Sequence, residues 1–103
     1  MAEFQTLRIS LLEDDPDQAA SVSAWINDRG YQCTHFDSAD EFQRAFRKTS
    51  FDVVVLDWAL TTGSSGFEVL QWMRQTVGTD VPVIFCHGEA GRVRYCKRVA
   101  SRC

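Results

Sequence analysis

The stretch Phe51-Asp-Val-Val-Val-Leu-Asp57 gives the strongest indication of fold in this 103-residue chain. Its three valines and one leucine form a run that is too short for a helix and too apolar for a half-exposed strand. Such a run predicts a strand that is buried on both faces, as in a parallel sheet. The strand ends in a carboxylate, and open α/β sheets bind their ligands outside the carboxyl ends of their strands. Asp57 is therefore the first candidate for a functional residue.

Strands and helices are expected to alternate on either side of this stretch. The predicted strands are residues 7–12, 31–36, 51–57 and 81–86, and helices are predicted to begin near residues 16, 39, 67 and 90. This alternation predicts an α/β fold, a doubly wound parallel sheet with right-handed crossovers, in a single domain over residues 1–103. Several apolar residues at helical spacing are expected to point inward. They are Trp25 in the first helix; Phe67, Leu70, Trp72, Met73 and Val77 in the third; and Val93, Cys96 and Val99 in the last.

The composition limits the location and the partners of the chain. No apolar run is long enough to cross a membrane, and the start lacks the pattern of a signal peptide, so a cytoplasmic protein without membrane contact is expected. The four cysteines lack metal-binding spacing and are expected to be free thiols. Residues 92–103 carry five basic and no acidic side chains. Without aromatic interleaving, this charge is more typical of the wet face of a helix than of a nucleic-acid site.

A pair of acids follows the first predicted strand and points to a metal site. If the first and third strands are neighbours, they lie about 4.8 Å apart, so Glu13, Asp14 and Asp57 project into one small volume. Like carboxylates at close range share protons or bind a cation, and an all-oxygen site open to water suits Mg²⁺ or Mn²⁺. The ion would also neutralise an incoming phosphoryl group, which leaves Asp57 as the candidate nucleophile that forms an acyl phosphate.

In combination, four segments resemble the receiver domain of bacterial two-component response regulators. They are Leu11-Leu-Glu-Asp-Asp-Pro16, residues 52–60, Gly66-Phe-Glu-Val-Leu70 and Val81-Pro-Val-Ile-Phe85, in the order of that family and at close to its spacing. The resemblance covers about residues 5 to 100. It implies a flavodoxin-like sheet with strand order 2-1-3-4, in which the family's strand five and its helix are missing. The domain is thus expected to be incomplete at its C-terminal end.

The resemblance also implies the chemistry of the site. It implies that Asp57 accepts a phosphoryl group from a sensor histidine kinase or a phosphotransfer protein, in a phosphorelay that signals to a partner or output domain. Mg²⁺ would be held by Asp14, Asp57 and the backbone carbonyl of Ala59, with Glu13 as the second acid. Such a protein is a signalling phosphoacceptor rather than an enzyme, with only self-phosphotransfer and self-dephosphorylation. Contact with nucleic acid would come only through an output domain outside this chain.

Three departures from the family pattern concern the switch. Thr61 stands where the family has proline, and the distance from Asp57 to Gly66 is one residue longer than usual. The family's hydroxyl residue at the end of strand four aligns with His87, which is a possible switch position. The family's lysine has no counterpart. His35, by contrast, is expected to be an ordinary strand residue.

Other functions remain open at this stage. One is a pseudo-receiver, an interaction module that keeps the fold without a phosphorylation switch. Another is a Mg²⁺-dependent phosphohydrolase of the haloacid-dehalogenase type, although Ala59 stands where that family has a second Asp. A third is a flavin or nucleotide binder that uses residues 61–66 as a phosphate loop, although such a loop usually follows the first strand.

The missing end predicts self-association. Without a fifth parallel strand, residues 81–86 form a sheet edge whose backbone groups are unpaired along one side. An uncovered apolar face would add to this liability. The chain is therefore expected to associate with itself through strand four and the last helix, or to be only marginally folded.

Overall fold

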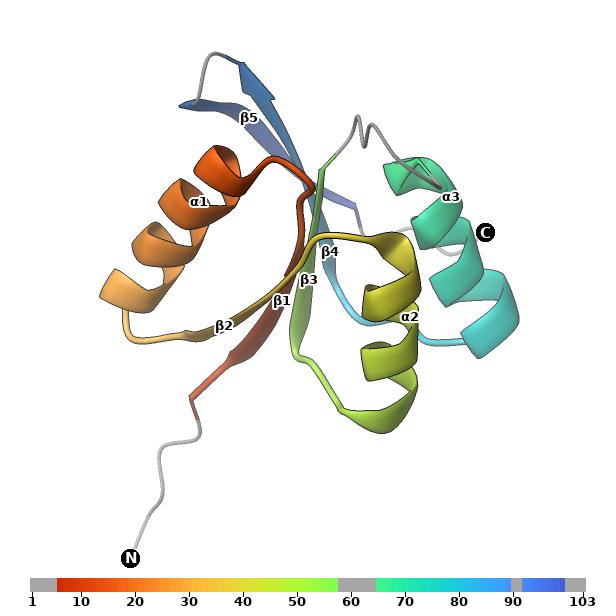
Figure 1. The fold of residues 1–103 in the computed structure, drawn as a ribbon. Coiled ribbons are helices and arrows are strands. Elements are labelled where there is room, and N and C mark those ends of the chain that lie inside the picture. The colour runs from red at the N-terminus through yellow and green to blue at the C-terminus, as the bar shows by residue number, and fades with distance from the viewer. Residues whose placement is uncertain (1–5, 58–64, 90–91, 100–103) are drawn as a thin grey trace, which may run out of the picture.

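A five-stranded sheet with the order β2-β1-β3-β4-β5 forms the centre of the molecule (Figure 1). The computed structural model describes residues 6–57, 65–89 and 92–99, with side chains for 6–57 and 65–86. The strands are β1 Arg8–Leu12, β2 Gln32–Phe36, β3 Val53–Asp57, β4 Val83–Glu89 and β5 Arg92–Val99. The first four run parallel in the order 2-1-3-4, which confirms the predicted α/β class and topology.

Helices cover both faces of this sheet, α1 on one side and α2 and α3 on the other (Figure 1). Their bounds are α1 Pro16–Asp28, α2 Ala39–Lys48 and α3 Gly66–Gln71, and the π-helix η1 Trp72–Val77 continues α3. Side chains satisfy the free amides at the helix starts. The Asp15 carboxylate accepts from the amides of Asp17 and Gln18 at 2.9 and 3.3 Å, and the Ser38 hydroxyl accepts from Glu41 at 3.2 Å.

Each face of the sheet has its own hydrophobic core, and β3 contributes to both. Val54 and Leu56 are fully buried in the cluster shared with α2 and α3. Val55 points the other way, into the cluster shared with α1, and is 5% exposed. Alternate residues of β3 thus lie on opposite faces, and both faces are covered. The prediction of a strand buried on both sides is confirmed.

The predicted last helix is wrong, because Arg92–Val99 forms the antiparallel strand β5 against β4. Val93, Cys96 and Val99 fit a helical period, but Val93, Tyr95 and Val99 also fit the alternation of a strand. Only two residues separate β4 from β5, which is a common connection length for a hairpin. The unpaired edge of β4 supplies backbone partners that a helix would leave unused.

Pairing with β5 also removes the free strand-four edge on which the expected self-association rested. The ladder runs from Val83 opposite Val99 to Glu89 opposite Arg92, with a shift between His87 and Gly88. Within the described residues, β4 is therefore an inner strand. The described part after β4 contains neither the family's parallel strand five nor a helix.

The cysteine prediction is correct for one described residue and wrong for another. Cys33 is free, whereas Cys86 is disulfide-bonded. The spacing of the four cysteines gave no indication of this bond.

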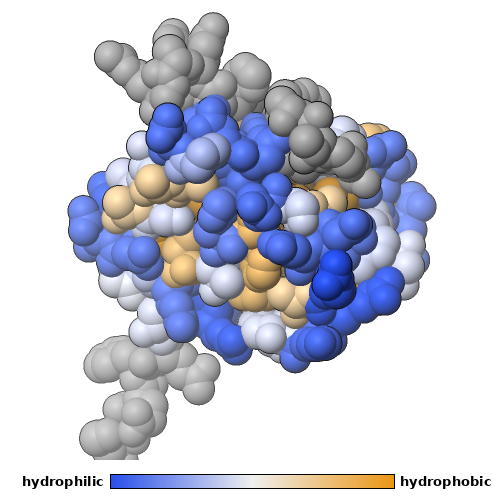
Figure 2. Space-filling model, viewed as in Figure 1, coloured by the Kyte–Doolittle hydropathy of each residue, from blue (hydrophilic) through white to orange (hydrophobic). Residues whose placement is uncertain are grey.

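Three residues expected in the interior lie at the surface. Trp25 is 57% exposed and its ring lies under the guanidinium of Arg29, with the guanidinium carbon 3.7 Å from the ring centre. Phe67 and Val77 are 49% and 41% exposed, although Leu70 and Met73 are buried as predicted. The wider turn of η1 shifts the phase of the helix, so Val77 leaves the buried face. The face seen in Figure 2 is mainly hydrophilic, with hydrophobic residues gathered near its centre and at its upper left.

Removing β5 is expected to promote self-association. A chain shortened to residues 1–89 should form larger species as its concentration rises, because the outer edge of β4 becomes available for pairing. The 103-residue chain is the control and should keep one mass over the same dilution series. Sedimentation velocity measures both. Equal association of the two chains would contradict the role given to β5.

Candidate functional site

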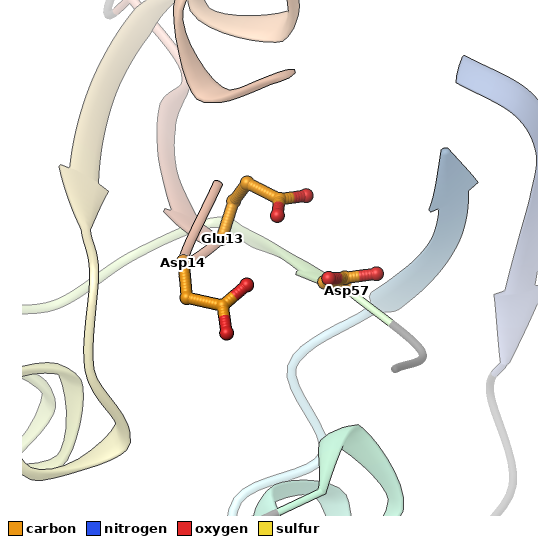
Figure 3. Close-up of side chains that lie close together, drawn as sticks. All are labelled: Glu13, Asp14 and Asp57. Carbon is orange, nitrogen blue, oxygen red and sulfur yellow. The ribbon is translucent and has the colours of Figure 1, made fainter. Parts of the chain in front are cut away.

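The three acids singled out from the sequence lie together at the carboxyl ends of β1 and β3 (Figure 3). Leu12 pairs with Leu56 in the β1–β3 ladder, so the residues that follow each strand emerge side by side. One carboxylate oxygen from each of Glu13, Asp14 and Asp57 lies within 4.8 Å of the others. The parallel register brings the cluster together, as the spacing between neighbouring strands predicts.

Burial makes this cluster electrostatically costly. Glu13 and Asp57 are only 4% and 7% exposed, and Asp14 is partly buried. Burial, followed by the charges of Asp57 and Asp14, raises the pKa of Glu13 from its usual 4.5 to about 7. The amide of Asp15, which donates to the Glu13 carboxylate at 3.0 Å, acts in the opposite direction on this pKa. A cation at the cluster would relieve the repulsion.

Strand β2 holds the backbone of the acidic turn. The amide of Glu13 donates to the carbonyl of Phe36 at 3.0 Å. The carbonyl of Glu13 lies 2.7 Å from Nε2 of His35. Sequence reasoning treated His35 as an ordinary strand residue and missed this second contact. A histidine at the end of the strand beside an acidic turn was the available signal.

Gly66 lets α3 begin directly against the end of β3. A Cβ at this position would clash with the carbonyl oxygen of Asp57 and would lie 3.0 Å from the ring of Phe85. A capping box fixes the start of the helix. Ser65 Oγ accepts from the Glu68 amide at 3.2 Å, and Glu68 Oε1 accepts from the Ser65 amide at 2.9 Å. The sequence identified the glycine as part of a turn but not this close approach.

The remaining predicted site residues cannot be joined to the cluster. Ala59, Trp58 and the loop from Thr61 to Ser64 lie outside the described residues. His87 lies in β4, one residue beyond Cys86, which is the ladder partner of Asp57. Its backbone is therefore placed near the carboxyl end of β3, and its side chain is outside the described part.

A doubly wound parallel sheet with acids at the ends of two adjacent central strands is the architecture of receiver-type signalling domains. The family model described as the response regulator receiver domain matches residues 9–100. That match covers most of the chain, which therefore belongs to this family. No match was found among curated proteins. In the described part, no helix is long and apolar enough to span a membrane.

Solved structures show the same fold. The response regulator TrrA from Thermotoga maritima, in complex with Mg²⁺-BeF, is similar with TM-score 0.74 and 24% identity, covering 82% of this chain and 72% of its own. The chemotaxis response regulator CheY4 of Vibrio cholerae is similar with TM-score 0.74 and 21% identity, over 84% of this chain and 72% of its own. The receiver domain of Francisella response regulator 1452 is similar with TM-score 0.73 and 20% identity, over 82% of this chain and 69% of its own. Across eight such structures, this chain spans 57% to 73% of the matched chain's length.

Alanine at Gly66 is expected to destabilise the protein by about 1–3 kcal/mol, because the added methyl group pushes on the backbone of Asp57. An unconstrained helical glycine would instead gain up to about 1 kcal/mol from alanine, so the sign alone tests the contact. Urea unfolding measures the change. Gln75→Ala, on the exposed side of η1, is the control and should stay within about 0.5 kcal/mol. A more stable Gly66→Ala variant would contradict the model of a close approach.

The metal-free protein is expected to lose stability as the pH rises. Between pH 4.5 and about 7 the folded protein keeps the Glu13 proton that the unfolded chain has already lost. The free energy of unfolding therefore falls across this window, by roughly 1–3 kcal/mol. Urea unfolding in the presence of a chelator measures it. Glu13→Gln should flatten the dependence, whereas Glu41→Gln at an exposed position should not. Equal slopes in both variants would rule out Glu13 as the source.

Proposed function

We propose that this chain is a phosphoacceptor receiver module, which takes a phosphoryl group onto Asp57 from a sensor histidine kinase or a phosphotransfer protein. The observation that carries the proposal is the cluster of Glu13, Asp14 and Asp57 within 4.8 Å, at the end of β1 and β3. Membership of the receiver family supports the proposal that Asp57 accepts the phosphoryl group. Residues 1–103 act in this proposal as one receiver-type domain whose C-terminal end departs from the family.

The donor set fits a hard divalent ion. Carboxylate oxygens are the ligands that Mg²⁺ and Mn²⁺ prefer, and Mg²⁺ typically uses one or two protein carboxylates beside water. Asp14, Asp57 and the backbone carbonyl of Ala59 would hold the ion, with Glu13 as the second acid. When bound, it would neutralise part of the charge on the carboxylates and on the incoming phosphoryl group. The similarity to TrrA, whose structure is a complex with Mg²⁺-BeF, supports this assignment.

Asp57 performs the transfer in this proposal. A carboxylate oxygen of Asp57 attacks the phosphorus, the bond from phosphorus to the donor nitrogen breaks, and that nitrogen keeps the electron pair. The donor ring, protonated beforehand on its other nitrogen, leaves as neutral imidazole, and the product on Asp57 is an acyl phosphate. Burial of Asp57 in a site bounded by β1, β3 and α3 holds the carboxylate in one orientation. The module has no turnover substrate, so only self-phosphotransfer and self-dephosphorylation are expected.

A second candidate is the pseudo-receiver, which binds a partner without a phosphorylation switch. Two observations favour it. His87 stands where the family resemblance places a hydroxyl residue, and β4 leads into an antiparallel strand rather than a crossover helix. Asp57 would then be a structural acid. A phosphohydrolase is less well supported, because Ala59 stands where that chemistry needs a second carboxylate.

Phosphorylation by a small donor distinguishes these functions. Incubation with acetyl phosphate and Mg²⁺ should add the mass of one phosphoryl group, in a form that hydroxylamine removes. Asp57→Asn should abolish the adduct, and Asp52→Asn, at the opposite end of β3 and exposed, should leave it intact. Intact-protein mass spectrometry reads the result. Absence of the adduct in the unsubstituted protein would favour the pseudo-receiver.

Metal binding is expected to depend on Asp14. Replacement by asparagine keeps the size of the side chain and removes one charged ligand, so the Kd for Mg²⁺ should rise at least about tenfold. Titration followed by tryptophan fluorescence, with Trp58 as the proposed reporter, measures it. Asp40→Asn, on the exposed start of α2, is the matched control. An unchanged Kd in Asp14→Asn would remove Asp14 from the ligand set.

A further inference from the structure

The side chain of His35 contacts the backbone of the acidic turn at Glu13. It lies in β2 opposite Leu11, and its ring extends past the end of the β1–β2 ladder to the carbonyl of Glu13. The distance from Nε2 to that oxygen is 2.7 Å. A carbonyl oxygen only accepts hydrogen bonds, so Nε2 must carry the hydrogen and donate it. The same residue, Glu13, also donates its amide to the carbonyl of Phe36.

The geometry of the peptide bond carries this contact to the proposed metal ligand. The carbonyl of Glu13 and the amide of Asp14 belong to one planar peptide unit. A hydrogen bond that fixes the Glu13 carbonyl therefore also fixes the orientation of the Asp14 amide and the position of the Asp14 α-carbon. Two hydrogen bonds from β2, one on each side of the Glu13 α-carbon, leave little freedom of rotation before Asp14.

Asp14 is the acid of the cluster that directly follows the contacted carbonyl in the chain. Asp57 is the buried last residue of β3, and the Glu13 carboxylate is buried and accepts from the amide of Asp15. Asp14 lies beyond the last residue of β1 and is only partly buried. Repulsion from the other two carboxylates also favours its rotation away from the cluster.

We propose that His35 is a positioning residue, which holds the Glu13–Asp14 peptide so that the Asp14 carboxylate faces Asp57. This proposal rests on the proposed function, since it assigns His35 to the same metal and phosphoryl site. In this proposal the hydrogen bond from His35 affects Mg²⁺ affinity and phosphorylation only through the orientation of Asp14. His35 itself does not contact the ion. Groups that orient metal ligands typically change metal affinity by about 10- to 100-fold when removed.

Two substitutions separate the donor from the shape of the side chain. His35→Phe keeps a ring of similar size and removes the donor. His35→Gln keeps a nitrogen donor, because its amide Nε2 lies the same number of bonds from Cβ as Nε2 of histidine. We expect His35→Phe to raise the Kd for Mg²⁺ about tenfold and to slow phosphorylation by acetyl phosphate. His35→Gln should restore most of both. The urea midpoint should be similar in the two variants.

The readouts also separate this proposal from the proposed function. In the metal-free protein, the amide NMR signal of Asp14 should shift in His35→Phe and stay near its original position in His35→Gln. If the unsubstituted protein binds no Mg²⁺, the proposed function fails, and this shift still decides whether His35 holds the turn. Equal Mg²⁺ affinity in all three proteins, or an unmoved Asp14 signal in His35→Phe, would overturn the positioning role. Loss of stability in both variants without a difference in affinity would make His35 structural only.

Discussion

Repulsion among three carboxylates at the ends of two neighbouring strands is the constraint on which the site depends. Glu13, Asp14 and Asp57 hold ligand oxygens within 4.8 Å of one another, and two of them are almost fully buried. Charges at this distance in a partly desolvated site share protons or bind a cation. The pKa of Glu13, raised to about 7, shows the first of these responses. A cation at the cluster would favour the deprotonated form of Glu13, so metal binding and protonation of Glu13 oppose each other.

The sheet supplies the stability that keeps the acids together. A buried valine or leucine contributes about 1.5–3 kcal/mol, and β3 alone buries Val54, Val55 and Leu56. Their sum exceeds the roughly 3 kcal/mol that the pKa shift of Glu13 represents. Since the cost is smaller than the gain, the strands keep their register, which holds Glu13 and Asp57 at neighbouring strand ends. The close approach of Gly66 to Asp57 adds a steric limit from the third side.

Features whose causes are local in the chain could be predicted from the sequence. The valine run of β3, the acids after β1 and the caps at Asp15 and Ser38 each depend on neighbouring residues, and the structure has them where the patterns indicate. The proximity of the acids followed from one further assumption, that β1 and β3 are neighbours. Features that depend on distant partners were missed. The ring of His35 meets Glu13 across 22 positions of sequence, and no local pattern shows that contact.

Residues 92–99 are a second case in which a distant partner, and not the local sequence, decides the structure. Their apolar positions fit a helix and a strand equally, so the period of the sequence does not decide between the two. The edge of β4 decides, because it offers backbone partners along its whole length. Phe67 illustrates the complementary case, in which the helix was predicted correctly and its buried face was not. The buried residues Gly66, Val69, Leu70 and Met73 centre that face away from Phe67.

In the proposed function, Asp57 would accept the phosphoryl group and another part of the protein would have to respond to it. Cys86, the ladder partner of Asp57, is followed by His87 and then by the shifted register of the β4–β5 hairpin. A phosphoryl group changes a protein only through groups that contact it in one state and not in the other. In the proposed function a response would start from groups beside Asp57. Among the described residues, one such group is the acidic turn, where the Glu13 carbonyl accepts from His35.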